Sequence, residues 1–195
     1  MINYYQELLL LPQEEIPIHF LWSKVFQQIH LGLVEMQDEQ GKIPIGVSFP
    51  DYVTGEKCSL LGGKLRLFAQ DETTLSRFNA NQWLARLSDY VHCTGIRPVP
   101  EKLTGYAIYQ REQPKTSNER LARRYAKRHN EDYDTALARY SDKAHKSIAT
   151  PFIRLKSLSG NQEFCLWIKK IVVKERRGAT FSSYGLSAES SVPEF

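Results

Sequence analysis

Six segments with distinct hydrophobic periods fill the first half of the chain, and they constrain its fold more than any other feature. Four of them are predicted strands, at 2–11, 45–49, 64–69 and 91–99, with clear alternation of apolar and polar residues at 64–69 and partial alternation at 2–11. The other two carry apolar residues at the helical spacing of 3.6, over 17–36 and 71–88. The order strand, helix, strand, strand, helix, strand predicts a ferredoxin-like domain over residues 1–98, a plan found in many RNA-binding domains.

A second domain is expected over residues 99–195, with Pro98 and Pro100 in the linker at the boundary. Its first part shows a strand and two helices, at 106–110, 117–129 and 131–146. Its second part shows two strands, 152–159 and 163–173, separated by residue types that are common in hairpin turns. The whole chain is therefore expected to be an α+β protein of two domains.

Composition narrows the class of protein. Apolar residues make up 42% of the 195 positions, which is enough to bury a core. The three cysteines lie far apart without a Cys-x-x-Cys pair, which indicates a reducing compartment and predicts no structural metal. The first residues lack the features of a signal peptide, and no apolar run approaches the roughly 20 residues of a membrane span. We expect a cytoplasmic protein without a membrane partner, cofactor or metal ion.

Positive charge is concentrated in one segment. Residues 111–129 hold seven Lys or Arg and two Glu, a net charge of +5, while the rest of the chain sums to −1. Five cations follow a helical spacing that places them on one stripe without an interleaved acid: Arg120, Arg123, Arg124, Lys127 and Arg128. A phosphate lattice would relieve the repulsion between them. The alternative is a solvated charged face, and the stripe by itself does not distinguish RNA from DNA.

Several separated pieces of sequence resemble one protein family. They are FQQIHLGLVE, IGVSFP, QREQPKTSNERLARRYAKRH, RLKSLSGNQEF and FSSYGLS. In this order, and from end to end of the chain, they resemble the repeat-processing endoribonuclease of subtype I-F CRISPR systems. The resemblance implies metal-independent cleavage of precursor crRNA, 3′ of the repeat stem-loop, by a 2′-OH attack that leaves a 2′,3′-cyclic phosphate. It also implies near single turnover, because that enzyme stays on the mature crRNA with the other subunits of the type I-F crRNA-guided surveillance complex.

The resemblance assigns three catalytic residues. His30 matches the general base, a role that suits histidine near neutral pH. Ser157 matches the serine that holds the nucleophilic 2′-OH, and Tyr184 matches the tyrosine that orients the imidazole. The residue pattern alone favours plainer roles: a half-buried helix residue, a serine near a turn, and a tyrosine packed in the core.

The same resemblance assigns the RNA contacts. Phe164 would stack on the terminal base pair of the stem, although the pattern alone fits a core strand residue equally well. Arg111 and Gln113 match the family's linker pair and would read base edges near the bottom of the stem. The basic stripe would follow the phosphates of the stem's major groove. Ser159 completes the implied contacts.

Three positions depart from the family's pattern, and three other functions stay open. Gly160 stands where a hydroxyl residue is expected, Lys127 replaces an arginine, and Pro114 follows Gln113. These changes affect contacts at the scissile phosphate and the choice of repeat. The alternatives are a module that only binds the hairpin, a DNA-binding protein that uses the basic helix, and a metal-dependent nuclease. A metal-dependent nuclease is the least favoured of the three, because the sequence has no Asp/Glu cluster with metal-ligand spacing near His30.

Overall fold

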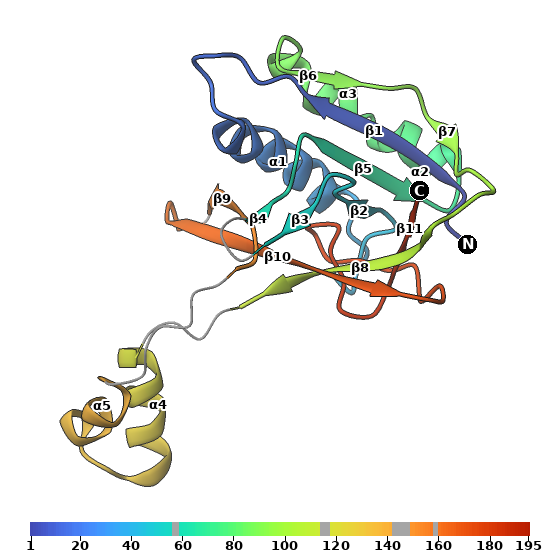
Figure 1. Ribbon diagram of the computed structural model, residues 1–195. Helices are drawn as coiled ribbons and strands as arrows, with labels where there is room; N and C mark the ends of the chain where they lie inside the picture. Colours follow the sequence, from blue (N-terminus) through green and yellow to red (C-terminus); the bar gives the residue numbers. More distant parts are fainter. Residues whose placement is uncertain (56–58, 114–117, 142–148, 158–159) are drawn as a thin grey trace. The chain divides into compact units, whose positions relative to one another are not determined.

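The computed structural model describes residues 1–55, 59–113, 118–141, 149–157 and 160–195 (Figure 1). The chain divides into two compact units. The first contains Met1–Glu112 together with Thr150–Phe195, and the second contains Gln113–Ala149. Sheets and helices both occur in the first unit, so the expected α+β class is confirmed. The domain boundary expected near residue 98 stays a prediction. The two compact units meet instead at residues 112–113 and 149–150.

One sheet of the first unit is built from the first half of the chain. Its strands are β1 (Tyr4–Leu10), β2 (Gly46–Ser48), β5 (Lys64–Ala69) and β6 (Val91–Cys93), with β7 (Arg97–Pro98) also paired to β1. The order is β2-β5-β1-β6, and the pairings are antiparallel. All four expected strands are present. The segment expected as a single strand over 91–99 forms two short ones.

Helix α1 (Ile18–Glu35) follows Pro17, whose fixed φ suits the position before a first helical turn. Its buried face repeats every three to four residues, as the sequence pattern predicted: Leu21, Trp22, Val25, Phe26, Ile29, Gly32 and Leu33. The second expected helix, over 71–88, is wrong as a single element. It forms α2 (Glu72–Phe78), α3 (Ala80–Trp83) and the 3-10 turn η1 (Ala85–Leu87). Asn79 breaks it because its backbone is left-handed, with a φ of 49°.

A second sheet is built from the second half of the chain. Its strands are β8 (Gly105–Glu112), β9 (Phe152–Lys156), β10 (Glu163–Val173) and β11 (Val192–Glu194), in the antiparallel order β11-β8-β10-β9. β10 has the predicted bounds, whereas β11 was not predicted. The small hairpin of β3 (Val53–Thr54) and β4 (Ser59–Leu60) was not predicted either. Residues 158–159 of the strand expected over 152–159 lie outside the described residues.

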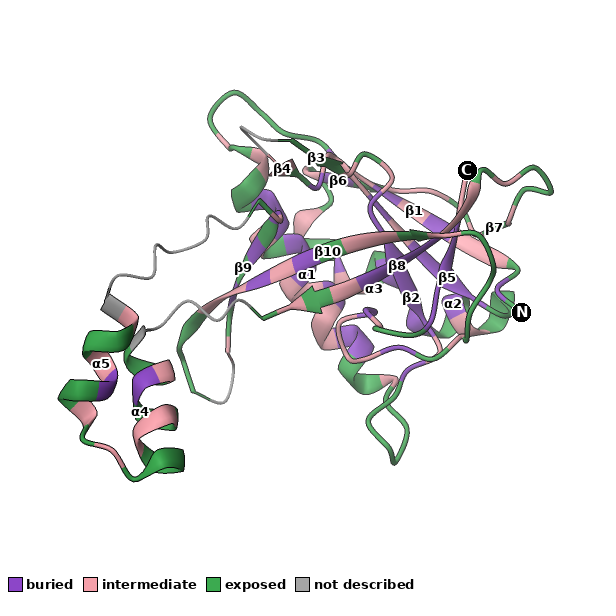
Figure 2. Cartoon of the chain, turned by 60° about the horizontal axis from the view of Figure 1, so that its bottom comes forward, coloured by how far each residue is buried: buried purple, intermediate pink, exposed green. Residues whose placement is uncertain are grey.

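The two sheets share one hydrophobic core. Leu65 and Leu67 of β5 are buried in the same cluster as Ile153 and Leu155 of β9. Figure 2 shows this as buried ribbon along α1, β5, β8 and β10. Burial of this extent is the dominant stabilising term in a folded domain. The elements that carry the candidate site therefore pack against one shared core.

The second unit is a pair of helices, α4 (Asn118–His129) and α5 (Tyr133–Ser141). Its buried residues among those described are two small ones, Ala122 and Ala136, and Figure 2 shows one buried spot on each helix. Around them Tyr125 contacts the Tyr140 ring edge-on, with centroids 6.2 Å apart. α4 agrees with the helix expected over 117–129, of which residue 117 lies outside the described residues. The helix expected over 131–146 begins at Tyr133, and residues 142–148 are likewise not described.

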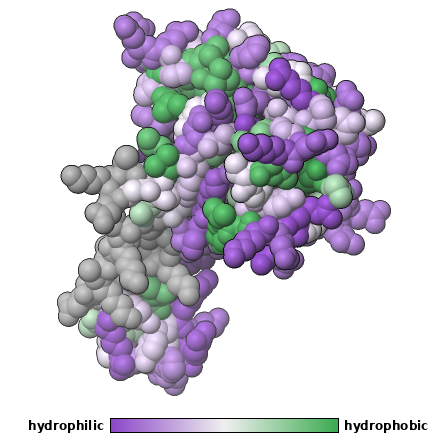
Figure 3. Space-filling model, turned by 45° about the vertical axis from the view of Figure 1, so that its right-hand side comes forward, coloured by the Kyte–Doolittle hydropathy of each residue, from purple (hydrophilic) through white to green (hydrophobic). Residues whose placement is uncertain are grey.

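The surface of the chain is mixed in polarity. Figure 3 shows mostly hydrophilic side chains on the face in view, with separate hydrophobic patches. Within the described residues, no helix has the length and hydropathy needed to cross a membrane.

Candidate functional site

His30 lies on α1 at the edge of its buried face and is half-buried. Its Nδ1 is 2.8 Å from the backbone carbonyl oxygen of Ser183. A carbonyl oxygen can only accept, so Nδ1 carries the proton and Nε2 of the neutral ring presents a lone pair. Burial lowers the pKa of the imidazole below its ordinary 6.5, and the hydrogen bond to Ser183 opposes part of that shift. The ring is thus a neutral base near pH 7.

The ring of Tyr184 stacks on the ring of His30. Their centroids are 4.2 Å apart and their planes differ by 8°. The contact is face to face, so Tyr184 fixes the plane of the imidazole by packing rather than by a hydrogen bond from its hydroxyl. The orienting role implied for Tyr184 stays a prediction, and this stacked contact is the geometry through which it would act.

A tight turn holds Ser183 and Tyr184 against His30. The N–H of Gly185 donates to the Ser182 carbonyl at 2.7 Å. Gly185 has a φ of +69°, and a Cβ there would lie 2.4 Å from Cγ1 of Val47 on β2. Only glycine meets both conditions without strain. Sequence reasoning assigned no role to Ser183 or Gly185. The glycine within SYGLS was the available signal for a left-handed turn, whereas nothing in the sequence marks a carbonyl.

Two further predicted residues, Arg111 and Phe164, lie next to the stacked rings of His30 and Tyr184: Arg111 contacts Tyr184, and Phe164 contacts Arg111. The guanidinium carbon of Arg111 lies 5.8 Å from the ring centroid of Tyr184 and 5.6 Å from that of Phe164. These distances place a cation over two aromatic faces. Arg111 is exposed, while Phe164 is half-buried on β10. The structure therefore brings together four residues that are far apart in sequence. Arg111 belongs to strand β8, although a linker position was expected.

Ser157 follows β9 directly. Its N–H donates to the Gln162 carbonyl at 2.8 Å, and its Oγ accepts from the Gly160 N–H at 3.3 Å. A Cβ at Gly160 would lie an ordinary 3.8 Å from that Oγ, so the residue that departs from the family's pattern leaves room for a side chain. Ser159 lies outside the described residues.

A hydrogen bond ties the strand before Ser157 to the helix of His30. The N–H of Lys156 donates to Oε1 of Gln27 at 3.2 Å. Gln27 precedes His30 on α1 by three residues, which is about one helical turn. Sequence reasoning did not identify Gln27. Its position puts the end of β9 within one turn of the candidate base.

The basic stripe lies on α4 in the second unit, and its five cations are exposed: Arg120, Arg123, Arg124, Lys127 and Arg128. One expectation about it needs correction, because an acid does reach the stripe. Glu119 is 4.0 Å from Arg123, one turn away, and both side chains are about 70% exposed. Such a pair contributes little to stability. Gln113 is also exposed, and it is assigned to this unit.

The described residues include no group of three or more His, Cys, Asp or Glu side chains that could hold a metal ion. Among the cysteines, Cys93 and Cys165 are free and half-buried, while Cys58 lies outside the described residues.

Comparison with known proteins identifies relatives along the full chain. The family model of the CRISPR-associated protein Cas_Csy4 matches residues 5–195. A protein described as CRISPR-associated endonuclease Cas6/Csy4 from Escherichia coli (strain UTI89 / UPEC) is 34% identical over 195 residues, which is the whole of both chains. A second with that description, from Pseudomonas aeruginosa (strain UCBPP-PA14), is 35% identical over 196 residues, again the whole of both.

Among solved structures, one described as "An RAMP protein binding different RNA substrates" matches 98% of this chain and all of its own. Its identity is 11% and its TM-score 0.35, so the likeness carries no argument about this chain. The family model and the two full-length relatives establish the family of this chain by themselves. This chain belongs to the CRISPR-associated Csy4 family.

Proposed function

We propose that this protein is an endoribonuclease that recognises the CRISPR repeat stem-loop, cuts precursor crRNA 3′ of it without a metal ion, and stays on the product. Membership of the Csy4 family and two relatives described as CRISPR-associated endonucleases support this proposal. The antiparallel strand order β2-β5-β1-β6 supports a ferredoxin-like arrangement of the first half of the chain. Type I-F surveillance-complex subunits are the proposed partners after cleavage.

The observation that carries the proposal is the hydrogen bond from His30 Nδ1 to the Ser183 carbonyl. It selects the tautomer in which Nε2 is the basic nitrogen. The lowered pKa keeps that nitrogen unprotonated near pH 7. Stacking by Tyr184 holds the ring in one plane. A neutral, oriented and half-exposed imidazole is what a general base requires.

In the proposed reaction the nucleophile belongs to the RNA. The 2′-OH beside the scissile phosphate attacks phosphorus, and its proton passes to His30 Nε2. The bond from phosphorus to the 5′ oxygen of the next nucleotide breaks, and solvent protonates that oxygen. The products are a 2′,3′-cyclic phosphate and a 5′-OH. Ser157 holds the 2′-OH in the attacking position, since a hydroxyl can both donate and accept.

Recognition is divided among the remaining residues. Phe164 stacks on the last base pair of the stem, and Arg111 beside it reads a base edge together with Gln113. The cations of α4 bind stem phosphates and supply affinity that is independent of sequence. Ser159 contributes at the scissile phosphate.

Cleavage of a repeat transcript in EDTA by wild type and His30→Ala tests the proposal. We expect the variant to cleave at least about 10²-fold more slowly while its hairpin affinity stays within about tenfold. His19→Ala is the matched control, because His19 is an exposed histidine of the same helix, and it should cleave as wild type. Hairpin binding by wild type without cleavage would show a binding module instead, and tighter binding to duplex DNA would show a DNA-binding protein.

A single 2′-deoxy nucleotide at the cleavage site tests the chemistry. It should abolish cleavage and leave binding unchanged, because it removes the attacking oxygen. Cleavage of that RNA would show that water is the nucleophile and would end the cyclic-phosphate mechanism.

A further inference from the structure

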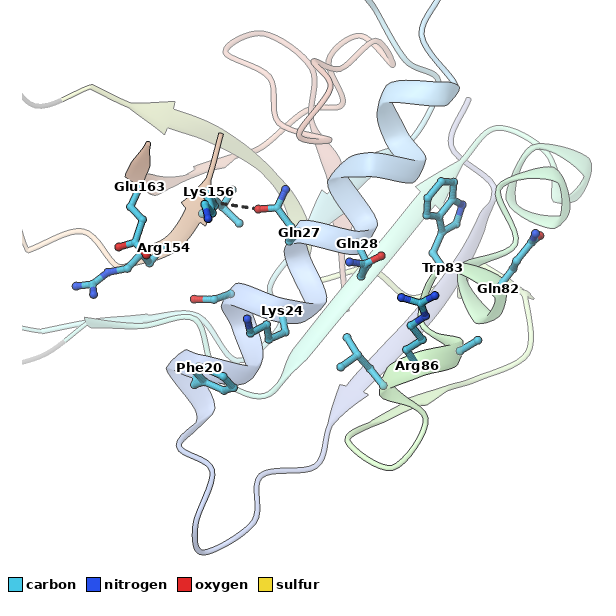
Figure 4. Close-up of a pocket in the computed structure, with 14 residues that line it drawn as sticks. Phe20, Lys24, Gln27, Gln28, Gln82, Trp83, Arg86, Arg154, Lys156 and Glu163 are labelled. Atoms are coloured by element: carbon cyan, nitrogen blue, oxygen red, sulfur yellow. Dashed lines mark hydrogen bonds between the residues drawn. The ribbon is translucent and has the colours of Figure 1, made fainter. Parts of the chain in front are cut away.

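A groove beside the candidate site combines positive charge with aromatic side chains. It encloses about 810 Å³ and lies entirely within the first unit. Three parts of that unit line it: α1, the α3–η1 segment, and the β9–β10 pair. Figure 4 shows side chains of α1 between Trp83 and Arg86 on one side and Arg154 and Lys156 on the other.

The charge of the groove is strongly biased. Four exposed cations line it, Lys24, Arg86, Arg154 and Lys156, against one carboxylate, that of Glu163. Across the described part of the chain, none of the four forms an ion pair. Four cations gathered in a groove with a single carboxylate repel one another, and a chain of phosphates relieves that repulsion while releasing its own counterions.

The aromatic residues of the groove narrow the class of ligand. Phe20 is 48% exposed, and Trp83 is half-buried. The ammonium group of Lys24 lies 5.1 Å from the centroid of the Phe20 ring, so a cation and an aromatic face are side by side. Proteins that bind single-stranded nucleic acid combine these two features, because the phosphates bind cations while the unpaired bases stack on aromatic rings.

The groove adjoins the candidate site. Lys156 lines it and directly precedes Ser157, and Gln27 lines it one helical turn before His30. The hydrogen bond from the Lys156 N–H to Gln27, dashed in Figure 4, joins the two elements of the groove that carry these residues, β9 and α1. Neighbouring residues of a strand point to opposite faces. Glu163 therefore belongs to the groove, while Phe164 points to the side of Arg111 and Tyr184.

We propose that this groove binds the single-stranded RNA that continues 3′ from the cleavage site. The proposal rests on the proposed function. With the end of the stem on Phe164, the strand that carries the scissile phosphate passes Ser157 and enters the groove. The groove then holds the precursor but not the hairpin product, because the product ends at the cyclic phosphate. Cleavage thereby removes one set of contacts and leaves the stem contacts intact.

Two RNAs and three proteins test this division. One RNA is the hairpin that ends at the cut, and the other carries about eight further 3′ nucleotides, within the usual site size of such grooves, and a 2′-deoxy nucleotide that blocks cleavage. The proteins are wild type, the groove variant Lys24→Ala/Arg86→Ala, and the control Arg97→Ala/Lys102→Ala. The control removes two exposed cations that do not line the groove. Thermal melting verifies that all three are folded.

Wild type and the control should bind the extended RNA roughly 3–10-fold more tightly than the short one near 0.1 M salt, and the groove variant should bind both equally. Equal binding of the two RNAs by wild type would overturn the proposal, and so would a groove variant that keeps the preference. If that variant keeps the preference but no longer joins the other subunits, the groove is a protein-docking site and the proposal is wrong. Absence of hairpin binding or precursor cleavage by wild type would instead refute the proposed function.

Discussion

The two units hold their candidate functional residues in opposite ways. In the first unit, His30 is fixed by a carbonyl and a ring that are about 150 residues away in the sequence. Those groups rest on a turn that packs against β2, within a core shared by two sheets. In the second unit, the cations of α4 are exposed, and Ala122 and Ala136 are the buried contacts among the described residues. Figure 2 shows the same difference in burial.

The difference fits the two roles proposed for these units. General-base catalysis depends on the orientation of one proton acceptor, and small displacements are costly. Phosphate binding depends on the number and spacing of positive charges, which a short exposed helix already provides. We therefore expect packing changes in the first unit to affect cleavage rate, and charge changes in the second to affect affinity and its salt dependence.

The largest expected effect follows from Gly185→Ala. The added Cβ would overlap Val47, and the residue would keep a left-handed backbone, so the turn must move and carry Ser183 and Tyr184 away from His30. We expect single-turnover cleavage to fall roughly 10²-fold while hairpin affinity stays within about threefold. Gly95→Ala is the control, because no atom lies within 4 Å of its added Cβ. Wild-type cleavage by folded Gly185→Ala protein would show that the turn does not position the base.

An intermediate effect is expected from the double change Arg123→Ala/Arg124→Ala. It should weaken binding to every stem-loop by about tenfold and reduce the slope of log K against log salt by roughly one to two units. The cleavage rate of saturated RNA should remain that of wild type, because neither residue has a part in the proposed reaction. A lower rate at saturating protein would show that α4 also positions the cut, and the contrast between the units would fail.

Arg111→Ala provides the comparison for that variant. Arg111 lies over Phe164 and Tyr184, so its loss should cost about 1–3 kcal/mol on the cognate stem and much less on a stem with its bottom base pairs exchanged. Equal losses on both stems would mean that Arg111 contacts only the RNA backbone.

The smallest expected effect is that of pH between 7 and 8. A general base acts when neutral, and the pKa of His30 is lowered below 6.5. The rate should rise with pH up to that pKa and then level off, and it should gain less than about 1.3-fold from pH 7 to pH 8. Single-turnover rates from pH 5 to 8.5 measure this. A tenfold gain between pH 7 and 8 would indicate hydroxide as the base.

The sequence by itself determined those parts of the fold that depend on local pattern. Helix α1 and strands β5 and β10 lie where periodicity predicted them, because one long buried face leaves a repeat that can be recognised without knowing what covers it. The same holds for α4, whose cations repeat at helical spacing. The family resemblance then supplied His30, Ser157 and Tyr184, which composition and periodicity favoured only as structural residues.

Tertiary structure alone decided the features that depend on distant neighbours. The extra strand β11 forms by pairing with β8, a segment that no local window around residues 192–194 contains. Three details of the site are contacts between segments that are remote in sequence: the Ser183 carbonyl that selects the tautomer of His30, the stacked ring of Tyr184, and the Gln27 amide that reaches β9. A backbone carbonyl is present at every residue, so no sequence pattern can show which one a folded chain will bring within 2.8 Å of the His30 ring.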